Sequence, residues 1–443
     1  MKRTTFTVAA AVLALAALQG RAAAVGTPAP GAPAGWQPRG TVLTGAATTA
    51  DAPAMKVGVT YRDTIRPGES RFYGIALDTT SSAAVSAFAV PQAGSRVAYG
   101  DGIELKLQSA DGTDCDAQNA HFGADGDARP VGTAVSRLIT GDSGTPCQGA
   151  NQYTLQVHRV SAGSSDPDVW PLELRYVAEP GLRTGAAPPG PPAATGSASP
   201  APLTAGTPHQ AVGGTSFETA AAVRTGIWKD RVLPGETRFY KVPVDWGQQA
   251  TVFADFSSAP VRDDSAYVGS GVLLTAYSPV RERIAGGDRG YQGAPVSLVE
   301  QLAPVAYGNR AADDSRVIAV RYAGWYYFAV TVHPDVAEAV DGPVPVTLRI
   351  EVRGDAQPGP AYDGNARAAG IGVDARDVAS ANGTAGGGGG HSVALRYVAF
   401  AALGTGTVLL LFLAVWFAAA RRQVARAVDA APPRQGYGPP AGW

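Results

Sequence analysis

The chain contains the stretch YRDTIRPGESRFY at residues 61–73 and a second version of it, WKDRVLPGETRFY, at residues 228–240. The shared Pro-Gly-Glu predicts a turn, because proline presets φ at one turn position and glycine accepts φ > 0 at the next. Apolar residues then alternate from Tyr73 in the first copy and from Tyr240 in the second, which predicts a half-buried strand after each turn. The Asp at the third place of each copy predicts a short acceptor for free backbone N–H groups.

The similarity between the two halves continues downstream. Alternating apolar segments occur in the same order in both, and the matched segments are 103–107 and 272–277, 153–157 and 326–330, and 172–176 and 346–350. Short strands in a matched order predict a mainly β fold with two tandem β-sandwich domains, at 40–179 and 213–354. We expect each domain to fold independently, because each is large enough to bury its own core.

Three motifs of the second unit carry a resemblance to a known family. They are GGTSFETA at 213–220, Gly-x-x-x-Asp at 226–230 and Pro-Gly-Glu-x-x-Phe-Tyr at 234–240. Together they resemble the bacterial pre-peptidase C-terminal domain family. The resemblance implies small jelly-roll-like β-sandwiches, of the kind appended to secreted enzymes and surface proteins, and such modules serve several roles. The first unit has a degenerate start at 40–54, and no peptidase domain accompanies the two copies.

The N-terminal region predicts export. A basic dipeptide, an apolar run and the small residues at 22–24 predict a cleaved signal peptide over 1–24, with an uncleaved anchor as the alternative. Residues 25–39 are rich in Pro, Ala and Gly, and we expect them to be disordered.

The C-terminal region predicts a membrane anchor. Residues 397–420 are 24 residues without a charge, which is long enough to cross a hydrocarbon core of about 30 Å. Arg421 and Arg422 follow at once, so the positive-inside rule places the tail, 421–443, in the cytoplasm. The predicted protein is a single-pass protein of the cell membrane with its domains outside. Two interpretations of the Pro-rich tail stay open, a solvated stub and a docking peptide.

Two further segments have the composition of spacers. Residues 180–212 are rich in Pro, Gly, Ala, Ser and Thr, and residues 355–396 are Gly-rich, so we expect a linker and a flexible stalk. The first domain contains both cysteines, Cys115 and Cys147. In an exported protein we expect them to form one disulfide.

Overall composition excludes several functions. The formal net charge of −1 gives no general attraction for nucleic acid or anionic lipid. The sequence has no phosphate loop and no dinucleotide fingerprint, so we expect no cofactor. Abundant Ala, Gly and Pro, with far more Arg than Lys, are typical of a high-GC bacterium such as an actinobacterium.

One short motif suggests catalysis. GDSG at 141–144 resembles the nucleophile motif of chymotrypsin-like proteases, but that chemistry needs a histidine base and only His121 lies upstream. We therefore expect no enzyme, and an extracytoplasmic hydrolase that uses Ser143 or the Asp-rich loops is the alternative. Those loops, at 111–116 and 125–127, are also open to a calcium interpretation, although we assign no metal site.

An aromatic pair provides the candidate binding surface. Trp325 and Tyr327 occupy outward positions of a strand, where they can stack on sugars, anchor a partner or pack on a neighbouring strand or the stalk. The predicted function is non-catalytic binding or scaffolding at the cell surface, for example as an accessory subunit of an envelope or secretion complex. We expect an envelope protein or a cell-wall glycan as partner, and no nucleic acid.

Overall fold

The computed structural model shows a mainly β protein, with 44% of residues in strands and 7% in helices, as predicted. Residues up to Ala381 belong to one compact unit. The predicted signal peptide, the apolar run at 397–420 and the tail lie outside the described residues, which are 35–92, 94–123, 128–140, 144–186, 190–193 and 199–383. Within those ranges, no helix is long and apolar enough to cross a membrane.

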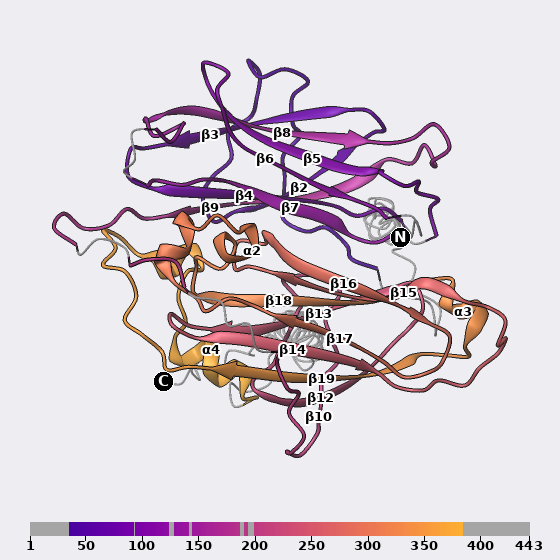
Figure 1. The fold of residues 1–443 in the computed structure, drawn as a ribbon. Coiled ribbons are helices and arrows are strands. Elements are labelled where there is room, and N and C mark those ends of the chain that lie inside the picture. Colours follow the sequence, from indigo (N-terminus) through magenta and orange to yellow (C-terminus); the bar gives the residue numbers. More distant parts are fainter. Residues whose placement is uncertain are drawn as a thin grey trace, which may run out of the picture. The chain divides into compact units, whose positions relative to one another are not determined.

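The first half of the chain forms two sheets, which we call the N-terminal sheet pair (Figure 1). Its strands are β1 (Thr41–Val42), β2 (Thr60–Ile65), β3 (Ser70–Leu77), β4 (Ser82–Ala89), β5 (Gly102–Ser109), β6 (Asp114–His121), β7 (Val131–Arg137), β8 (Asn151–Val160) and β9 (Trp170–Glu179). The strand orders are β1-β2-β9-β4-β7 and β3-β8-β5-β6. Inward-facing side chains of both sheets, among them Tyr73, Val85, Leu105 and Leu174, bury one core, which is β-sandwich packing.

The second half forms another two sheets, the C-terminal sheet pair. Its strands are β10 (His209–Gln210), β11 (Ala221–Ala222), β12 (Gly226–Val232), β13 (Glu236–Val244), β14 (Gln249–Phe256), β15 (Val268–Tyr277), β16 (Arg283–Tyr291), β17 (Val296–Gln301), β18 (Gly324–Val332) and β19 (Val344–Arg353). The strand orders are β10-β12-β19-β14-β17 and β11-β13-β18-β15-β16. The short helices are η1 (Tyr307–Ala311), α2 (Ser315–Ile318), α3 (Val336–Ala339), η2 (Ala366–Ala369) and α4 (Ala375–Ala381).

The repeated stretch takes up the same position in both pairs. Tyr73 on β3 and Tyr240 on β13 are both fully buried. The Tyr73 hydroxyl donates to Asp63 at 2.8 Å, and the Tyr240 hydroxyl donates to Asp230 at 2.6 Å. Each carboxylate also accepts from a backbone N–H, as the sequence predicted for an acid at this place. Burial raises the pKa of both tyrosine hydroxyls, so they stay protonated donors.

The Pro-Gly-Glu turn explains why three residue types recur. Gly68 has φ 69° and Gly235 has φ 80°, a left-handed conformation that glycine adopts without strain. The Glu side chain bonds back to the backbone N–H three residues earlier, at 2.7 Å to Arg66 in the first copy and at 3.1 Å to Leu233 in the second. The acid therefore closes the turn that the other two residues shape.

A buried interface joins the two sheet pairs, so that four sheets lie in successive layers in Figure 1. The outer face of β4, β7 and β9 packs against the outer face of β13, β15 and β18. At its centre is a set of buried side chains that we call the aromatic interface cluster: Trp36, Phe88, Val90, Phe217, Ala220, Phe239, Tyr277 and Ala329. The ring centroids of Phe88 and Phe217 are 4.8 Å apart, an edge-to-face contact.

Ion pairs cross the same interface. Arg281 lies 2.8 Å from Glu173 of β9, and Arg310 of η1 lies 2.9 Å from Glu179 of β9. All four side chains are at most 4% exposed. Strand and loop residues build this contact, which is why the composition of the linker at 180–212 gave no sign of it. The two units were expected to fold independently, and in the structure they share a buried interface.

The segment that follows β19 is folded against both sheet pairs. We call residues 355–381 the strap; the sequence analysis placed them in a flexible stalk. The Asp363 N–H donates to the Gly181 carbonyl at 2.7 Å, and the Tyr362 hydroxyl donates to Glu179 at 2.7 Å. Further along, η2 and α4 follow, and α4 packs on β13. Side-chain partners on the sheets, rather than its own composition, order this segment.

Candidate binding site

The outer face of the sheet β3-β8-β5-β6 is exposed and polar. In one row across the strands, Ser70, His158, Glu104 and Asn119 are register partners, so their side chains leave the sheet on the same side. Seven polar residues line a hollow of about 380 Å³ here, which we call the polar groove: Ser70, Glu104, Lys106, Gln118, Asn119, Gln156 and His158. The volume falls at the lower end of the roughly 300–1,000 Å³ typical of ligand pockets.

Hydrogen bonds fix one side of the polar groove. Gln156 Nε2 donates to Ser70 Oγ at 3.2 Å, and Ser70 Oγ lies 3.0 Å from His158 Nδ1. The serine hydroxyl either donates to Nδ1 or accepts from it, according to the histidine tautomer, so Nε2 is left as a donor or as an acceptor. Within the described residues, His158 Nε2, the Glu104 carboxylate and the Asn119 amide have no hydrogen-bond partner. These groups are available to a ligand.

The Ser70–His158 contact also has the composition of a nucleophile and its base. Acyl transfer additionally needs backbone or side-chain donors aimed at a developing oxyanion. Strands β8 and β5 each have a neighbour on both sides, so their N–H groups are used in the sheet ladder. The arrangement therefore suits hydrogen-bonded binding better than acyl transfer.

In the C-terminal sheet pair, the sheet β11-β13-β18-β15-β16 corresponds to the sheet that bears the polar groove. Its outer face forms the buried interface with the N-terminal sheet pair. Strand registers align the two faces position by position. Apolar or aromatic residues replace polar ones in three matched pairs, which are Glu104 and Leu273, Gln156 and Ala329, and Gln108 and Tyr277. Threonines match three other groove residues, in the pairs Ser70 and Thr237, Lys106 and Thr275, and His158 and Thr331. One face of the same architecture is thus covered by protein, and the other is left open.

The predicted binding residues lie against other parts of the chain. Trp325 Nε1 donates to Asp377 of α4 at 2.9 Å, and Lys241 Nζ lies 4.8 Å from the centroid of the Trp325 ring. The Tyr327 ring packs edge-on against Phe217 at 5.0 Å, next to the aromatic interface cluster. Both positions point outward from their strand as predicted, and both are half-buried by the strap and the interface.

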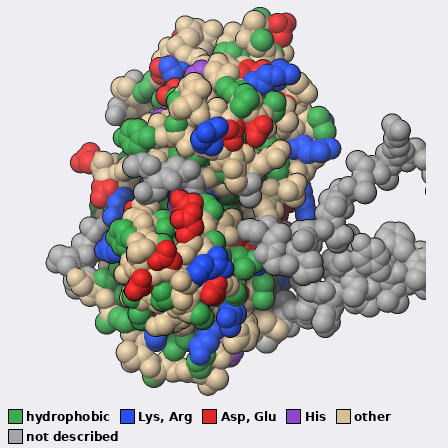
Figure 2. Space-filling model, turned by 90° about the vertical axis from the view of Figure 1, so that its right-hand side faces the viewer, with side chains coloured by type: hydrophobic (Ala, Val, Ile, Leu, Met, Phe, Trp, Pro, Cys, Tyr) green, Lys and Arg blue, Asp and Glu red, His purple; other side chains and the backbone are tan. Residues whose placement is uncertain are grey.

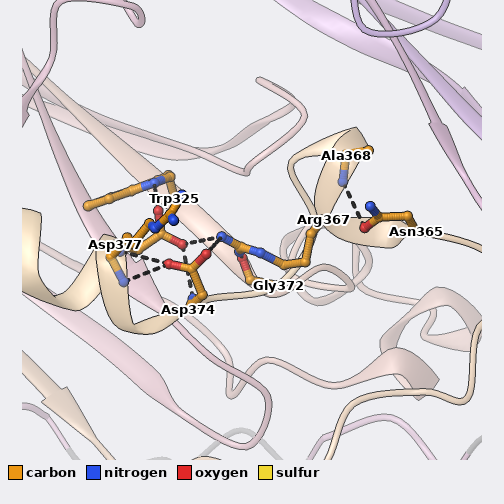
Figure 3. A network of polar contacts seen from close by, with 8 residues as sticks. Trp325, Asn365, Arg367, Ala368, Gly372, Asp374 and Asp377 are labelled. Carbon is orange, nitrogen blue, oxygen red and sulfur yellow. Dashed lines mark hydrogen bonds and ion pairs between the residues drawn. The ribbon is translucent and has the colours of Figure 1, made fainter.

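A polar network holds the end of the strap on Trp325 (Figure 3). Arg367 forms ion pairs with Asp374 at 2.9 Å and with Asp377 at 2.6 Å. Asp377 therefore connects α4 to the indole of Trp325 and to the guanidinium of Arg367. The backbone N–H of Asp377 lowers the pKa of Asp374, so this carboxylate is ionised at neutral pH.

The disulfide prediction is confirmed, because Cys115 and Cys147 are bonded. The nearby Asp111 accepts from the Thr113 N–H at 3.0 Å, and Asp114 pairs with Lys106 at 3.2 Å. Over the part of the chain that the structure describes, no group of three His, Cys, Asp or Glu residues is arranged to hold a metal ion. Ser143 and the acidic loop at 125–127 lie outside the described residues.

A second hollow, of about 440 Å³, is lined mainly by apolar groups, including Trp246, Tyr307 and Pro358. Sequence reasoning did not find either hollow. Alternation in the segments 103–107 and 153–157 separates the inward from the outward residues, but nothing in the sequence indicates which outward residues meet across neighbouring strands.

Charges are interspersed on the face of the molecule that Figure 2 shows, where Lys and Arg side chains alternate with Asp and Glu. This pattern agrees with the net charge of −1 and leaves no broad area of one sign on that face.

Comparison with known proteins gives no family. No family model matches the chain, and no curated protein matches it. Among solved structures, it is similar to the CBM22-1-CBM22-2 tandem of Paenibacillus barcinonensis Xyn10C, with 11% identity over 72% of this chain and 99% of that chain, at a TM-score of 0.16. It is also similar to the CUB1-EGF-CUB2 region of human MASP-1/3, with 7% identity over 66% of this chain and 99% of that chain, at a TM-score of 0.15. A putative uncharacterized protein from Burkholderia cenocepacia matches with 10% identity over 66% and 81% of the two chains, at a TM-score of 0.16. Similarities this low carry no argument about function.

Proposed function

We propose that the chain is a non-catalytic binding and scaffolding protein of the bacterial cell surface, with two tandem β-sandwich domains outside the cytoplasmic membrane and one span that anchors them. A tethered accessory subunit of an envelope or secretion complex is one form of this function. The observation that carries the proposal is that corresponding sheet faces of the two sheet pairs differ in what they contact. The face is covered by protein in the C-terminal sheet pair, and in the N-terminal sheet pair it is open and bears the polar groove.

Matched architecture supports the tandem part of the proposal. Apart from the additional two-residue strand β11, the two sheet pairs have the same strand order, and both place a buried tyrosine against an aspartate in the repeated stretch. The motifs at 213–220 and 234–240 add the resemblance to pre-peptidase C-terminal domains, whose implied fold is a β-sandwich.

The buried interface supports the scaffolding part. A contact made of aromatic rings and ion pairs that are almost fully buried restricts relative motion of the two sheet pairs, whereas modules joined only by a linker move freely. The apolar run at 397–420 and the arginines that follow it support the anchor.

Affinity purification of the full-length protein from its native membrane tests the proposal. We expect an envelope protein or cell-wall glycan to be enriched relative to a control chain that carries only the predicted span and tail, 397–443. Protease added to wall-stripped cells should remove the 40–354 region. Recovery of the same partners with the control chain, or survival of the 40–354 region, would contradict the proposal.

A hydrolase is the second candidate, and the hydrogen bond between Ser70 and His158 is the observation that favours it. The same experiment tests the alternative hydrolase that uses Ser143. A serine-reactive fluorophosphonate probe should leave the native protein unlabelled if it only binds. Labelling that disappears in Ser70→Ala or Ser143→Ala would replace binding by catalysis.

A further inference from the structure

We propose that the polar groove binds a neutral, hydroxyl-rich ligand of the oligosaccharide class. This inference rests on the proposed function and names the ligand of one face. It concerns the row formed by Ser70, His158, Glu104 and Asn119, together with Gln156.

The free groups of the polar groove match the chemistry of sugar hydroxyls. Each hydroxyl both donates and accepts, so it requires donors and acceptors side by side. The Glu104 carboxylate offers acceptors, His158 Nε2 offers a donor or an acceptor according to its tautomer, and the Asn119 amide offers both. Neighbouring hydroxyls on a ring can pair with the two ends of one planar amide or carboxylate. Three strands supply these groups, so the rigid sheet rather than a loop fixes their spacing.

Comparison with the covered face argues against a protein ligand. Protein interfaces have an apolar, aromatic-rich centre from which charged groups are depleted. The C-terminal sheet pair has such a centre, with Tyr277 and Ala329 at positions matched by Gln108 and Gln156 in the N-terminal pair. Burying Glu104 against a protein would desolvate an unpaired carboxylate, which is costly. A hydrated, hydroxyl-bearing ligand avoids that cost.

Charge argues against an anionic ligand. Among the residues that line the polar groove, Lys106 carries the one permanent positive charge, and Asp114 pairs with it at 3.2 Å. Glu104 adds a negative charge to the same row. A phosphate or uronate polymer would therefore meet little net attraction and one repelling carboxylate.

The test is oligosaccharide binding by the full-length protein in a detergent without a sugar headgroup. The neutral probes are cellohexaose, mannohexaose and N-acetylchitohexaose, and a hyaluronan hexasaccharide is the anionic probe; all are titrated by calorimetry. The groove variants are Asn119→Ala and Gln156→Ala. Gln152→Ala is the matched control, because Gln152 lies on the same strand and the same face as Gln156 but outside the hollow.

We expect at least one neutral probe to bind. Each groove variant should weaken that binding about tenfold, which equals about 1.4 kcal/mol, and Gln152→Ala should leave it unchanged. Unchanged binding in the Asn119→Ala, Gln156→Ala double variant would overturn the site, and binding of the anionic probe alone would overturn the ligand class.

The affinity purification described above separates this inference from the proposed function. If the full-length protein enriches an envelope partner but binds no neutral oligosaccharide, the groove inference fails alone. If it neither enriches a partner nor binds a sugar, both fail.

Discussion

Replacing Arg281 by methionine tests how strongly the buried ion pair holds the two sheet pairs together. Arg281 Nη1 lies 2.8 Å from Glu173 Oε1, and the two side chains are 2% and 1% exposed. Removing one partner of such a pair leaves an uncompensated buried charge and costs about 3–5 kcal/mol.

The surroundings of Glu173 place the expected cost at the lower end of this range. Glu173 Oε2 also accepts from Trp36 Nε1 and from the Arg39 N–H, each at 3.1 Å, so the carboxylate keeps two donors. Burial, and then repulsion from Arg281, lowers the pKa of Arg175, so loss of Arg281 relieves an unfavourable contact nearby. We expect Arg281→Met to reduce the free energy of unfolding by about 3 kcal/mol.

A double-mutant cycle measures the interaction. Urea unfolding is followed for the full-length protein and for Arg281→Met, Glu173→Gln and the double variant. In the Arg281→Met background, Glu173→Gln should recover about 1–2 kcal/mol, because the amide removes the charge and still accepts from Trp36 and Arg39. A loss below about 1 kcal/mol in Arg281→Met, with no coupling to Glu173, would refute the reasoning.

Three further predictions concern other parts of the fold. Tyr73→Ala and Tyr240→Ala should each cost about 3 kcal/mol or more in thermal unfolding, because each removes a fully buried ring, and a loss confined to one of the two variants would contradict the equivalence of the two positions. Cys115→Ser, Cys147→Ser protein should lose about 3 kcal/mol, and thiol titration of unreduced, denatured protein should find no free thiol. The hydrogen bonds and ion pair that lower the pKa of Asp374 stabilise α4 at a pH above about 3.9, and this contribution is lost as the pH falls through the lower folded value. The protection factors of the α4 amides, which are corrected for the pH dependence of intrinsic exchange, should therefore fall there and stay constant near neutrality.

Local features of the fold could be predicted because they depend on neighbours in the sequence. The Pro-Gly-Glu turn, the strand that starts at Tyr73 and the inward direction of its side chain follow from backbone preferences and a period of two. The disulfide followed from the pairing that two cysteines are expected to form in a chain predicted to be exported.

The interface could not be predicted, because alternation separates the two faces of a strand but does not tell which outer face another sheet covers. Phe239 and Tyr327 occupy outward positions that look like exposed aromatics, and Arg281 and Arg310 look like surface charges. The candidate site was missed for the same reason, since His158 and Glu104 become neighbours only through strand pairing.

The buried interface joins the outer face of β4, β7 and β9 to the outer face of β13, β15 and β18, which do not correspond to each other in the two sheet pairs. Such a heterologous interface leaves one free copy of each face, so further modules could add at both ends. Each added module would offer the next one the same free face, and the series would grow into a filament. In this chain, hydrophilic residues on the two free faces replace aromatic residues of the interface. Gln108 stands where the second pair has Tyr277, and Asp255 stands where the first pair has Phe88. Aromatic residues at those two positions would give one chain both faces of a polymer subunit, so two side chains outside the cores of the sheet pairs set the free faces apart from the buried interface.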